Sequence, residues 1–184
     1  MESVEGTLAL VLTGTGKFFS NGLDLARFGS DPEEFLATLQ ELHRTVARLV
    51  NFPAYTVAAI NGHAFAGGAL ISCALDYRVM REDRGYWCMN EADIGLVLDE
   101  RLASILFNRL PRATAINAML TAHRYGASEA KSAGIVEATS SEGELLSDAI
   151  AIASGMATKD RGAIAAHKRL AYRSFVASLG FPLA

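Results

Sequence analysis

The sequence predicts an α/β protein with a largely parallel sheet, and two observations support this fold class. Before residue 90, short apolar runs at 8–12, 57–60, 77–80 and 86–89 have the length and composition of buried strands, and helical patterns lie between the first three. After residue 100 the pattern is almost entirely helical. Strands that alternate with helices and precede a helical tail are typical of a parallel sheet covered by helices.

The composition indicates one compact domain and excludes several classes of protein. A chain of 184 residues with 51% hydrophobic and 20% charged residues can bury a sizeable core. The formal net charge of -3 argues against a broad nucleic-acid surface, which is usually basic. No apolar run is long enough to span a membrane, and no signal peptide is recognisable. Cys73 and Cys88 form no CxxC pair, so we expect a cytoplasmic protein without disulfides.

The first long helix is predicted to begin at Pro32. Asp31 can cap it, Pro32 suits the first helical position, and Glu34 completes a spacing like that of a capping box. The apolar positions that recur at helical intervals are Phe35, Leu39, Leu42, Val46 and Leu49. The helix is expected to end at residues 51–53, because the residue before a proline disfavours helical geometry.

The remaining elements follow in order. The strand at 57–60 leads into the small-residue segment 61–68, and a buried helix is expected from Ala69 to Leu75. A charged turn at 81–85 separates the last two strands. Further helices are predicted at 100–110, 113–120, 128–133, 144–158 and 162–177. The strand at 8–12 lies close to Met1 with no neighbour before it, so we expect that an upstream part of the fold is missing.

Two familiar kinds of site are not supported by the motifs. Residues 14–17 suggest a phosphate-binding loop, but Val11 and Phe18 stand where that motif needs glycine and Ser or Thr. The four histidines have no spacing typical of metal ligands, so no metal site is expected.

Two segments, 18–25 and 61–68, have a common design that suits an oxyanion hole. Each leaves a strand through small residues that can expose backbone N–H groups, and the second leads into the start of a helix. Two such donors directed at one point stabilise a carbonyl oxygen that gains negative charge. Taken separately, each segment is better explained as an ordinary glycine turn.

Taken together, the two segments resemble the crotonase family, which includes enoyl-CoA hydratases and isomerases. The resemblance runs from about Leu8 to the last helix and includes residues 120–122 and 128–136. It implies a spiral of ββα units in a core of residues 1–122, and a helical oligomerisation region at 123–184. It also implies an acyl-CoA thioester substrate, no separate cofactor, and a homotrimer or a dimer of trimers.

The resemblance also assigns the binding site. It makes the backbone N–H groups of Leu23 and Gly67 the two oxyanion donors. The other residues expected to contact substrate are Phe19, Asn21, Gly22, Asp24, Leu25, Ala64, Phe65, Ala66, Gly68, Leu70, Trp87, Asn90 and Lys168. Lys17, Arg27 and Lys168 are candidates for contacts to the phosphates of coenzyme A, although solvated surface charge explains each of them equally well. Asp24 and Asp76 follow the family pattern and are expected to have structural roles.

The acid/base residue implied by the resemblance is Glu91. Family hydratases use two glutamates, and Leu70 occupies the first of those positions. Glu91, in the segment 89–95, matches the second and is similar to the Asn-Glu segment of Δ3,Δ2-enoyl-CoA isomerases. One carboxylate suits isomerisation, because it can take a proton from C2 and return it at C4. Trp87 is expected to line an apolar pocket and raise the pKa of Glu91, and Asp93 is the nearest rival.

Other activities remain open at this point. Residues 97–101 place charges where isomerases generally carry apolar and aromatic residues. Hydration or thioester hydrolysis is the enzymatic alternative, with water activated by Glu91 alone or together with Asp99. The non-enzymatic alternative is an acyl-CoA-binding subunit in which Glu91 is dispensable.

Overall fold

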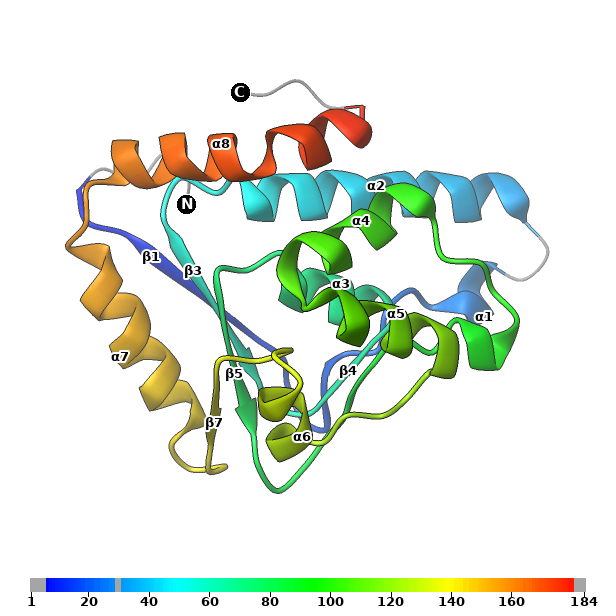
Figure 1. Cartoon of the computed structure of the whole chain (residues 1–184), viewed down its shortest axis with the longest axis horizontal. Coiled ribbons are helices and arrows are strands. Elements are labelled where there is room, and N and C mark those ends of the chain that lie inside the picture. Colours follow the sequence, from blue (N-terminus) through cyan, green and yellow to red (C-terminus); the bar gives the residue numbers. More distant parts are fainter. Residues whose placement is uncertain (1–5, 29–30, 181–184) are drawn as a thin grey trace.

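The structure, a computed structural model, describes residues 6–28 and 31–180 and contains two parallel sheets (Figure 1). The strands of the larger sheet, in spatial order, are β1 (Ala9–Thr13), β3 (Tyr55–Ile60), β5 (Tyr77–Arg81) and β7 (Ala138–Ser140). Those of the smaller sheet are β2 (Phe18–Ser20), β4 (His63–Phe65) and β6 (Trp87–Cys88). Every pairing within both sheets is parallel. The predicted α/β class is therefore confirmed.

Successive strands alternate between the two sheets, and this alternation creates the site. β1 is followed by β2, β3 by β4, and β5 by β6, so the same unit occurs three times. Phe18 pairs with His63, and Phe65 pairs with Cys88, which aligns the small sheet in one direction. Because parallel strands end at the same edge of a sheet, the segments that leave β2, β4 and β6 are neighbours.

The sequence did not distinguish the two sheets. β2 and β4 have three residues each, too few to show the two-residue alternation of a strand. β7 lies within the part of the chain that was predicted to be almost entirely helical. The helix α1 (Leu25–Phe28) was also not predicted, and it has a single turn.

The longer helices lie within two residues of the predicted bounds. α2 (Pro32–Val50) starts at the expected proline, and Oδ1 of Asp31 accepts hydrogen bonds from the backbone N–H groups of Glu33 and Glu34 at 3.0 and 3.2 Å. α3 (Gly67–Cys73) starts two residues earlier than predicted. The other helices are α4 (Glu100–Arg109), α5 (Arg112–Thr121), α6 (Ala127–Ser132), α7 (Leu145–Ala157) and α8 (Arg161–Ser178).

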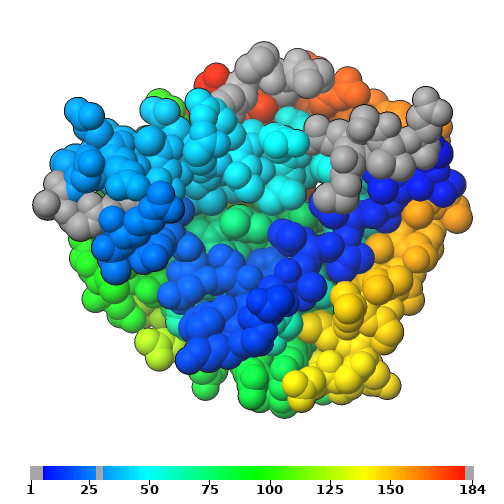
Figure 2. All heavy atoms as spheres, turned by 180° about the vertical axis from the view of Figure 1, so that it is seen from behind, coloured from blue at the N-terminus to red at the C-terminus, as the bar shows by residue number. Residues whose placement is uncertain are grey.

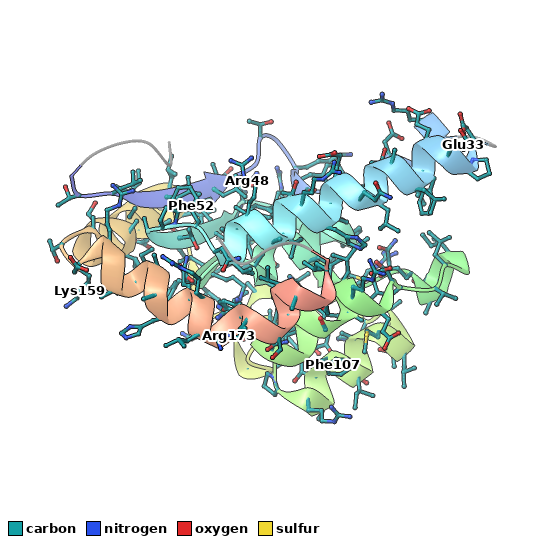
Figure 3. The ribbon with its side chains drawn as sticks, turned by 90° about the horizontal axis from the view of Figure 1, so that it is seen from above. Glu33, Arg48, Phe52, Phe107, Lys159 and Arg173 are labelled. Atoms are coloured by element: carbon teal, nitrogen blue, oxygen red, sulfur yellow. The ribbon has the colours of Figure 1, made fainter. Side chains whose placement is uncertain are left out.

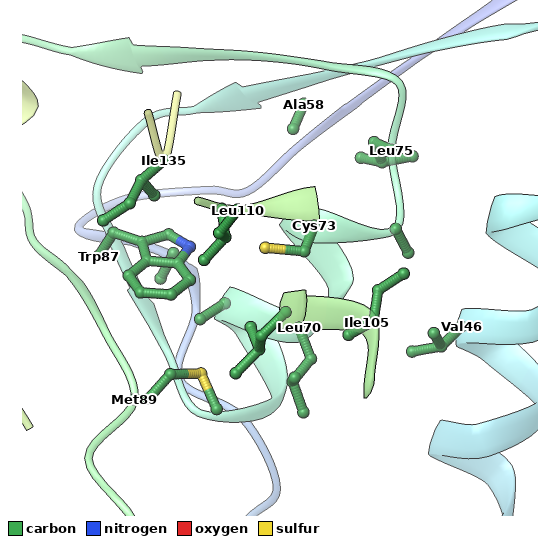
Figure 4. Packing of buried hydrophobic residues seen from close by; sticks show 14 of the residues in the cluster. Val46, Ala58, Leu70, Cys73, Leu75, Trp87, Met89, Ile105, Leu110 and Ile135 are labelled. Carbon is green, nitrogen blue, oxygen red and sulfur yellow. The ribbon is translucent and has the colours of Figure 1, made fainter. Parts of the chain in front are cut away.

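Helices cover both faces of the larger sheet. α7 packs on one face, where Val57, Val79 and Ala149 form a small buried cluster. The main cluster lies between the sheets and the helices α2 to α5 and α8. Figure 4 shows Leu70 and Cys73 of α3 in this cluster with Ile105 of α4. β1 is the edge strand of the larger sheet, and Figure 2 shows it along the surface.

A buried ion pair attaches α8 to the core. Nζ of Lys168 lies 2.6 Å from a carboxylate oxygen of Asp76 and donates to the carbonyl oxygens of Phe52 and Ala54. Asp76 also accepts from the backbone N–H and the hydroxyl of Thr56. Figures 1 and 3 show α8 running beside α2. A separate oligomerisation role for residues 123–184 stays a prediction.

Candidate active site

The two segments predicted to form the oxyanion hole meet at a pair of glycines. Gly22 has a φ of +81°, and a Cβ placed on it would lie 3.0 Å from the backbone nitrogen of Gly67. A Cβ on Gly67 would in turn lie 3.3 Å from the Cα of Gly22. Glycine is therefore required at position 22 both for its backbone conformation and for the close approach. This contact brings the peptide after Gly22 alongside the start of α3.

The backbone amides of Leu23 and Gly67 are available to a ligand. In the part of the chain that the structure describes, neither N–H donates to a protein acceptor, and both residues line the same cavity. Ala66 has φ of 47° and ψ of -116°, a conformation that L residues rarely adopt. Its own N–H donates to the carbonyl of Cys88, which ties the turn to β6. Two free amides on a fixed backbone form the arrangement that stabilises an oxyanion.

The cavity that Leu23 and Gly67 line has a volume of about 630 Å³. The elements around it are α1, α2, α3 and α4, which Figure 1 shows on the same side of the molecule. The predicted site residues that line this cavity are Asn21, Gly22, Leu23, Asp24, Leu25, Ala66, Gly67, Leu70, Asn90 and Glu91. Three separate segments of the sequence, 21–25, 66–70 and 90–91, thus converge, as expected from the strand–strand unit that occurs three times.

Apolar side chains that sequence reasoning had not assigned to the site form the rest of the wall. They are Phe35, Leu39 and Leu42 of α2, Leu102 of α4, and Ile94, Leu96, Val97 and Leu98 between them. The apolar face of α2 was predicted, but only as ordinary core. Its regular spacing shows that the face is buried, and it carries no signal that part of the face borders a cavity.

Glu91 follows β6 and precedes a short 3-10 helix, η1 (Ala92–Ile94). Its Oε2 is buried and has no hydrogen-bond partner among the described residues. Burial raises the pKa of the Glu91 carboxyl, and a backbone hydrogen bond within the residue opposes this shift. The carboxyl also borders a second cavity of about 150 Å³ with Met119 of α5. A carboxyl with a raised pKa in an apolar cavity suits proton transfer near neutral pH.

Trp87 does not line the cavity. Its side chain is fully buried in the core (Figure 4). Its Nε1 donates to the hydroxyl of Ser72 at 3.0 Å, and its ring packs against Tyr125. The environment that buries Glu91 therefore comes from other walls of the cavity. Asp93, the rival candidate, is exposed on η1 and lines neither cavity.

Five other predicted contact residues lie outside the cavity. Phe19, Ala64 and Gly68 are buried in the protein, and Phe65 packs against His63 with ring centroids 5.1 Å apart. Lys168 is the buried partner of Asp76, so its ammonium group does not reach the surface.

The other two cations proposed for the phosphates are on the surface. Lys17 lies over the ring of Phe18, and Arg27 forms an exposed ion pair with Glu34 at 3.2 Å.

Asp99 is a further acidic residue of the larger cavity, which Asp24 and Glu91 also line. It caps α4, where its Oδ1 accepts from the N–H of Leu102 at 3.0 Å. The same oxygen lies 3.0 Å from Nε2 of His43, which is only 6% exposed on α2.

A protein-family model described as enoyl-CoA hydratase/isomerase matches residues 2–178. The chain therefore belongs to the enoyl-CoA hydratase/isomerase family. This confirms the crotonase resemblance that the two glycine segments and Glu91 indicated.

The curated relatives include proteins named as enoyl-CoA isomerases and one named as a putative enoyl-CoA hydratase. The chain is 37% identical over 129 residues to enoyl-CoA delta isomerase 1, peroxisomal, of Arabidopsis thaliana, a match that covers 70% of this chain and 54% of the relative. It is 33% identical over 162 residues to enoyl-CoA delta isomerase 3 of the same plant, covering 79% of the chain and 68% of the relative. A putative enoyl-CoA hydratase of Thermus thermophilus is 37% identical over 165 residues, covering 85% and 63%. The chain thus spans about half to two thirds of the length of these relatives.

Solved structures agree on the fold. A probable enoyl-CoA hydratase of Mycobacterium tuberculosis H37Rv superposes with a TM-score of 0.88 at 28% identity, over 94% of this chain and 73% of that one.

Among the described residues, no helix has the length and hydropathy to cross a membrane, and no group of three His, Cys, Asp or Glu side chains is placed to hold a metal ion.

Proposed function

We propose that the chain is an enoyl-CoA isomerase that moves the double bond of a 3-enoyl thioester to the 2-position. One observation carries this proposal: Glu91, whose Oε2 is buried, and the free amides of Leu23 and Gly67 belong to residues that line one cavity. Leu70 stands where family hydratases place another glutamate. The names of the Arabidopsis relatives support the same reaction.

The amides would act on the thioester oxygen. Their two N–H groups donate hydrogen bonds to the carbonyl oxygen of the substrate. These hydrogen bonds become stronger as that oxygen gains negative charge. Each donor contributes roughly 3 kcal/mol toward the transition state. This stabilisation acidifies C2, and the departing proton leaves a dienolate whose charge is shared between the oxygen, C2 and C4.

Glu91 would carry the proton between the two carbons. Its ionised carboxylate accepts the proton from C2 and then donates it to C4, so the double bond forms between C2 and C3 and the carboxylate is restored. A positioned acid/base group contributes about 10²- to 10⁴-fold to the rate. The apolar side chains of Phe35, Leu39 and Leu102 offer the acyl chain a surface away from water.

The coenzyme A part of the substrate and the oligomeric state concern residues outside the cavity. Lys17 and Arg27 are the candidates for coenzyme A phosphates, since both are exposed cations. No cofactor is needed, because coenzyme A enters with the substrate. We expect a homotrimer or a dimer of trimers, to be measured by light scattering. A cytoplasmic location is supported by the two cysteines, both free thiols.

The test compares wild type with Glu91→Gln on a 3-enoyl-CoA, following the conjugated product by absorbance and mass. We expect the variant to lose about 10²- to 10⁴-fold in kcat while it still binds the thioester. Asp93→Asn is the matched control, because it makes a similar change two residues away and outside both cavities.

Three results would contradict the proposal. Full activity of Glu91→Gln would remove Glu91 from the mechanism. Release of free coenzyme A as the main reaction would identify a thioesterase. Binding without turnover by the folded wild type would identify an acyl-CoA-binding subunit.

A further inference from the structure

The isomerase mechanism assigns no role to Asp99, although this residue lines the cavity. Asp99 lies at the end of the segment that begins at Glu91, and it caps α4. Leu98, directly before it, and Leu102, three residues after it, line the same cavity. A carboxylate is therefore placed among the apolar residues that the proposed mechanism offers to the acyl chain.

The Asp99 carboxylate is held through one of its two oxygens. The N–H of Leu102 and Nε2 of His43 both lie 3.0 Å from Oδ1. Over residues 6–28 and 31–180, no protein group donates a hydrogen bond to Oδ2. Because a carboxylate can only accept, both contacts are donations to Oδ1. One oxygen thus fixes the side chain, and the other is left for a molecule in the cavity.

His43 has no evident reason to be buried other than this contact. It lies on the face of α2 that otherwise carries Leu39, Leu42 and Val46. A polar side chain in such a position costs stability unless it is hydrogen-bonded. Asp99 is its hydrogen-bond partner, 56 residues away in the sequence. The contact connects α2 to the start of α4 and fixes the direction of the carboxylate.

The free oxygen Oδ2 suits a neutral hydrogen-bond donor on the ligand. The N–H of His43 and the N-terminal end of α4 offset part of the negative charge of Asp99, which weakens its attraction for a cation. An unsubstituted acyl chain would displace water from Oδ2 and supply no donor, which costs binding energy. Of the described residues that line the cavity, none is Lys, Arg or His, so a carboxylate on the acyl chain would be repelled. A hydroxyl group on the acyl chain meets all three conditions.

We propose that Asp99, positioned by His43, selects 3-enoyl thioesters whose acyl chain carries a hydroxyl group beyond C4. The inference rests on the proposed isomerase function, in which Leu23 and Gly67 bind the thioester oxygen and Glu91 serves C2 and C4. The hydroxyl group donates to Oδ2 while the reacting carbons stay at Glu91. Asp99 belongs to the charged segment 97–101, where isomerases generally carry apolar and aromatic residues, and its role is specificity for this chain's own substrate.

The experiment measures kcat/KM for isomerisation of 3-enoyl-CoAs of one chain length. They carry hydrogen, a hydroxyl or a methyl ether at the same carbon, and that carbon is varied from C5 to the chain end. The ether can accept a hydrogen bond but cannot donate one, so it separates donation to Oδ2 from mere polarity. At one or more of these positions we expect wild type to prefer the hydroxyl over both other groups by about 10-fold or more.

Asp99→Asn reverses the polarity of the group left for the ligand. Its amide oxygen keeps the hydrogen bonds from Leu102 and His43, and its NH2 group takes the place of Oδ2. Because NH2 donates, the variant should use the ether and the hydroxyl within about twofold of each other. Glu100→Gln is the matched control: Glu100 is the next residue, exposed and outside the cavity, so the hydroxyl-to-ether ratio should keep its wild-type value.

Three results would overturn the inference. The first is a wild type that uses the three groups within about threefold of one another at every position, against the larger cost of an unpaired acceptor. The second is an Asp99→Asn variant that keeps the wild-type preference. The third is a stronger preference for an amino group at the same carbon, which would show that Asp99 acts through its charge.

A second measurement separates this inference from the proposed function. Dissociation constants of saturated acyl-CoAs with the same three groups, measured by calorimetry, need no turnover. A wild type without isomerase activity would contradict the proposed function. Binding of the hydroxylated thioester about 10-fold more tightly than the other two would still support the role of Asp99, and equal binding would overturn it.

His43 is tested as a positioning residue by two substitutions. His43→Phe removes the donor, so the carboxylate loses its fixed direction and the hydroxyl-to-ether ratio should fall by about fivefold or more. The rate on the unsubstituted chain should change less than this ratio. His43→Gln keeps an N–H donor and should recover most of the selectivity. An unchanged ratio in His43→Phe, or an equal loss in both variants, would show that His43 only packs the interior.

Discussion

The two walls of the cavity are built by different means. The glycine wall, formed by Gly22, Leu23, Ala66 and Gly67, offers backbone N–H groups and depends on the close approach of two chain segments. The other part of the lining, which we call the apolar wall, consists of side chains of Phe35, Leu39, Leu42, Leu98 and Leu102. The first wall is rigid because its backbone has little room to change. The second can vary in size one side chain at a time.

The two walls therefore have different roles in the proposed mechanism: the glycine wall acts on the reacting carbonyl group, and the apolar wall selects the acyl chain. A backbone donor survives changes of its own side chain, so Leu23 can stand in the glycine wall whatever its side chain contributes. The apolar wall makes no directed contact to the reacting atoms in the proposed mechanism, and it sets how much acyl chain is removed from water. Glu91, which follows β6, and Asp99, which caps α4, also line the cavity and belong to neither wall.

The largest effect is expected from Gly22→Ala. The new Cβ would meet the backbone nitrogen of Gly67 at 3.0 Å, on a residue with φ of +81°. The glycine wall must shift, so we expect at least 100-fold loss of isomerase kcat, as when one oxyanion donor is removed. The positive φ adds a loss of about 1–3 kcal/mol in the free energy of unfolding.

Gly155→Ala is the contrasting control, measured by thermal unfolding and by the same assay. Gly155 lies inside α7 and a Cβ there would meet nothing within 4 Å. It should stabilise the protein by about 0.5–1 kcal/mol and leave activity intact. A fully active Gly22→Ala would show that the junction of the two glycines does not position the donors.

The sequence predicts the glycine wall better than the apolar wall. Gly22 and Gly67 are visible in the sequence because a close backbone approach leaves glycines at fixed places, and Glu91 is visible because it follows a strand in a familiar segment. The apolar wall was not predicted, because Leu39 and Leu42 repeat at helical spacing whether they face core or cavity. Trp87 was assigned to the pocket for its aromatic character, and only the packing shows that it lies in the core.

The pairing of His43 with Asp99 was beyond sequence reasoning for another reason. The residues are 56 positions apart, on α2 and at the start of α4, and no local pattern indicates that they meet. The three-residue strands β2 and β4 were likewise missed, although the turns that follow them were recognised. Local backbone chemistry is thus predictable here, whereas contacts between distant helices are not.

A moderate effect is expected from enlarging the apolar wall with Leu39→Ala. Removing side-chain volume beside the acyl chain should lower kcat/KM for a short 3-enoyl-CoA by roughly 10-fold, since a lost apolar contact is worth about 1–3 kcal/mol. Longer acyl chains that fill the space should lose less. Leu36→Ala on the same helix is the control, because Leu36 is 56% exposed and does not line the cavity. Equal losses for short and long chains would remove Leu39 from acyl-chain selection.

The smallest effect is expected on stability. It tests whether the ionised carboxyl of Glu91 destabilises the folded protein. Burial raises the pKa of Glu91 in the folded protein above the usual value for an unfolded chain, about 4.3. As the pH rises from there through the folded pKa, the unfolded state loses its proton first, so the carboxyl progressively destabilises the fold. Glu91→Gln should therefore raise the Tm relative to wild type at pH 7 and give little difference below about pH 4. Asp93→Asn, exposed on η1, should show no such pH-dependent gain. A Glu91→Gln variant that is less stable than wild type at pH 7 would mean that the ionised carboxylate is stabilised in the fold, and the raised pKa on which proton transfer by Glu91 depends would have to be abandoned.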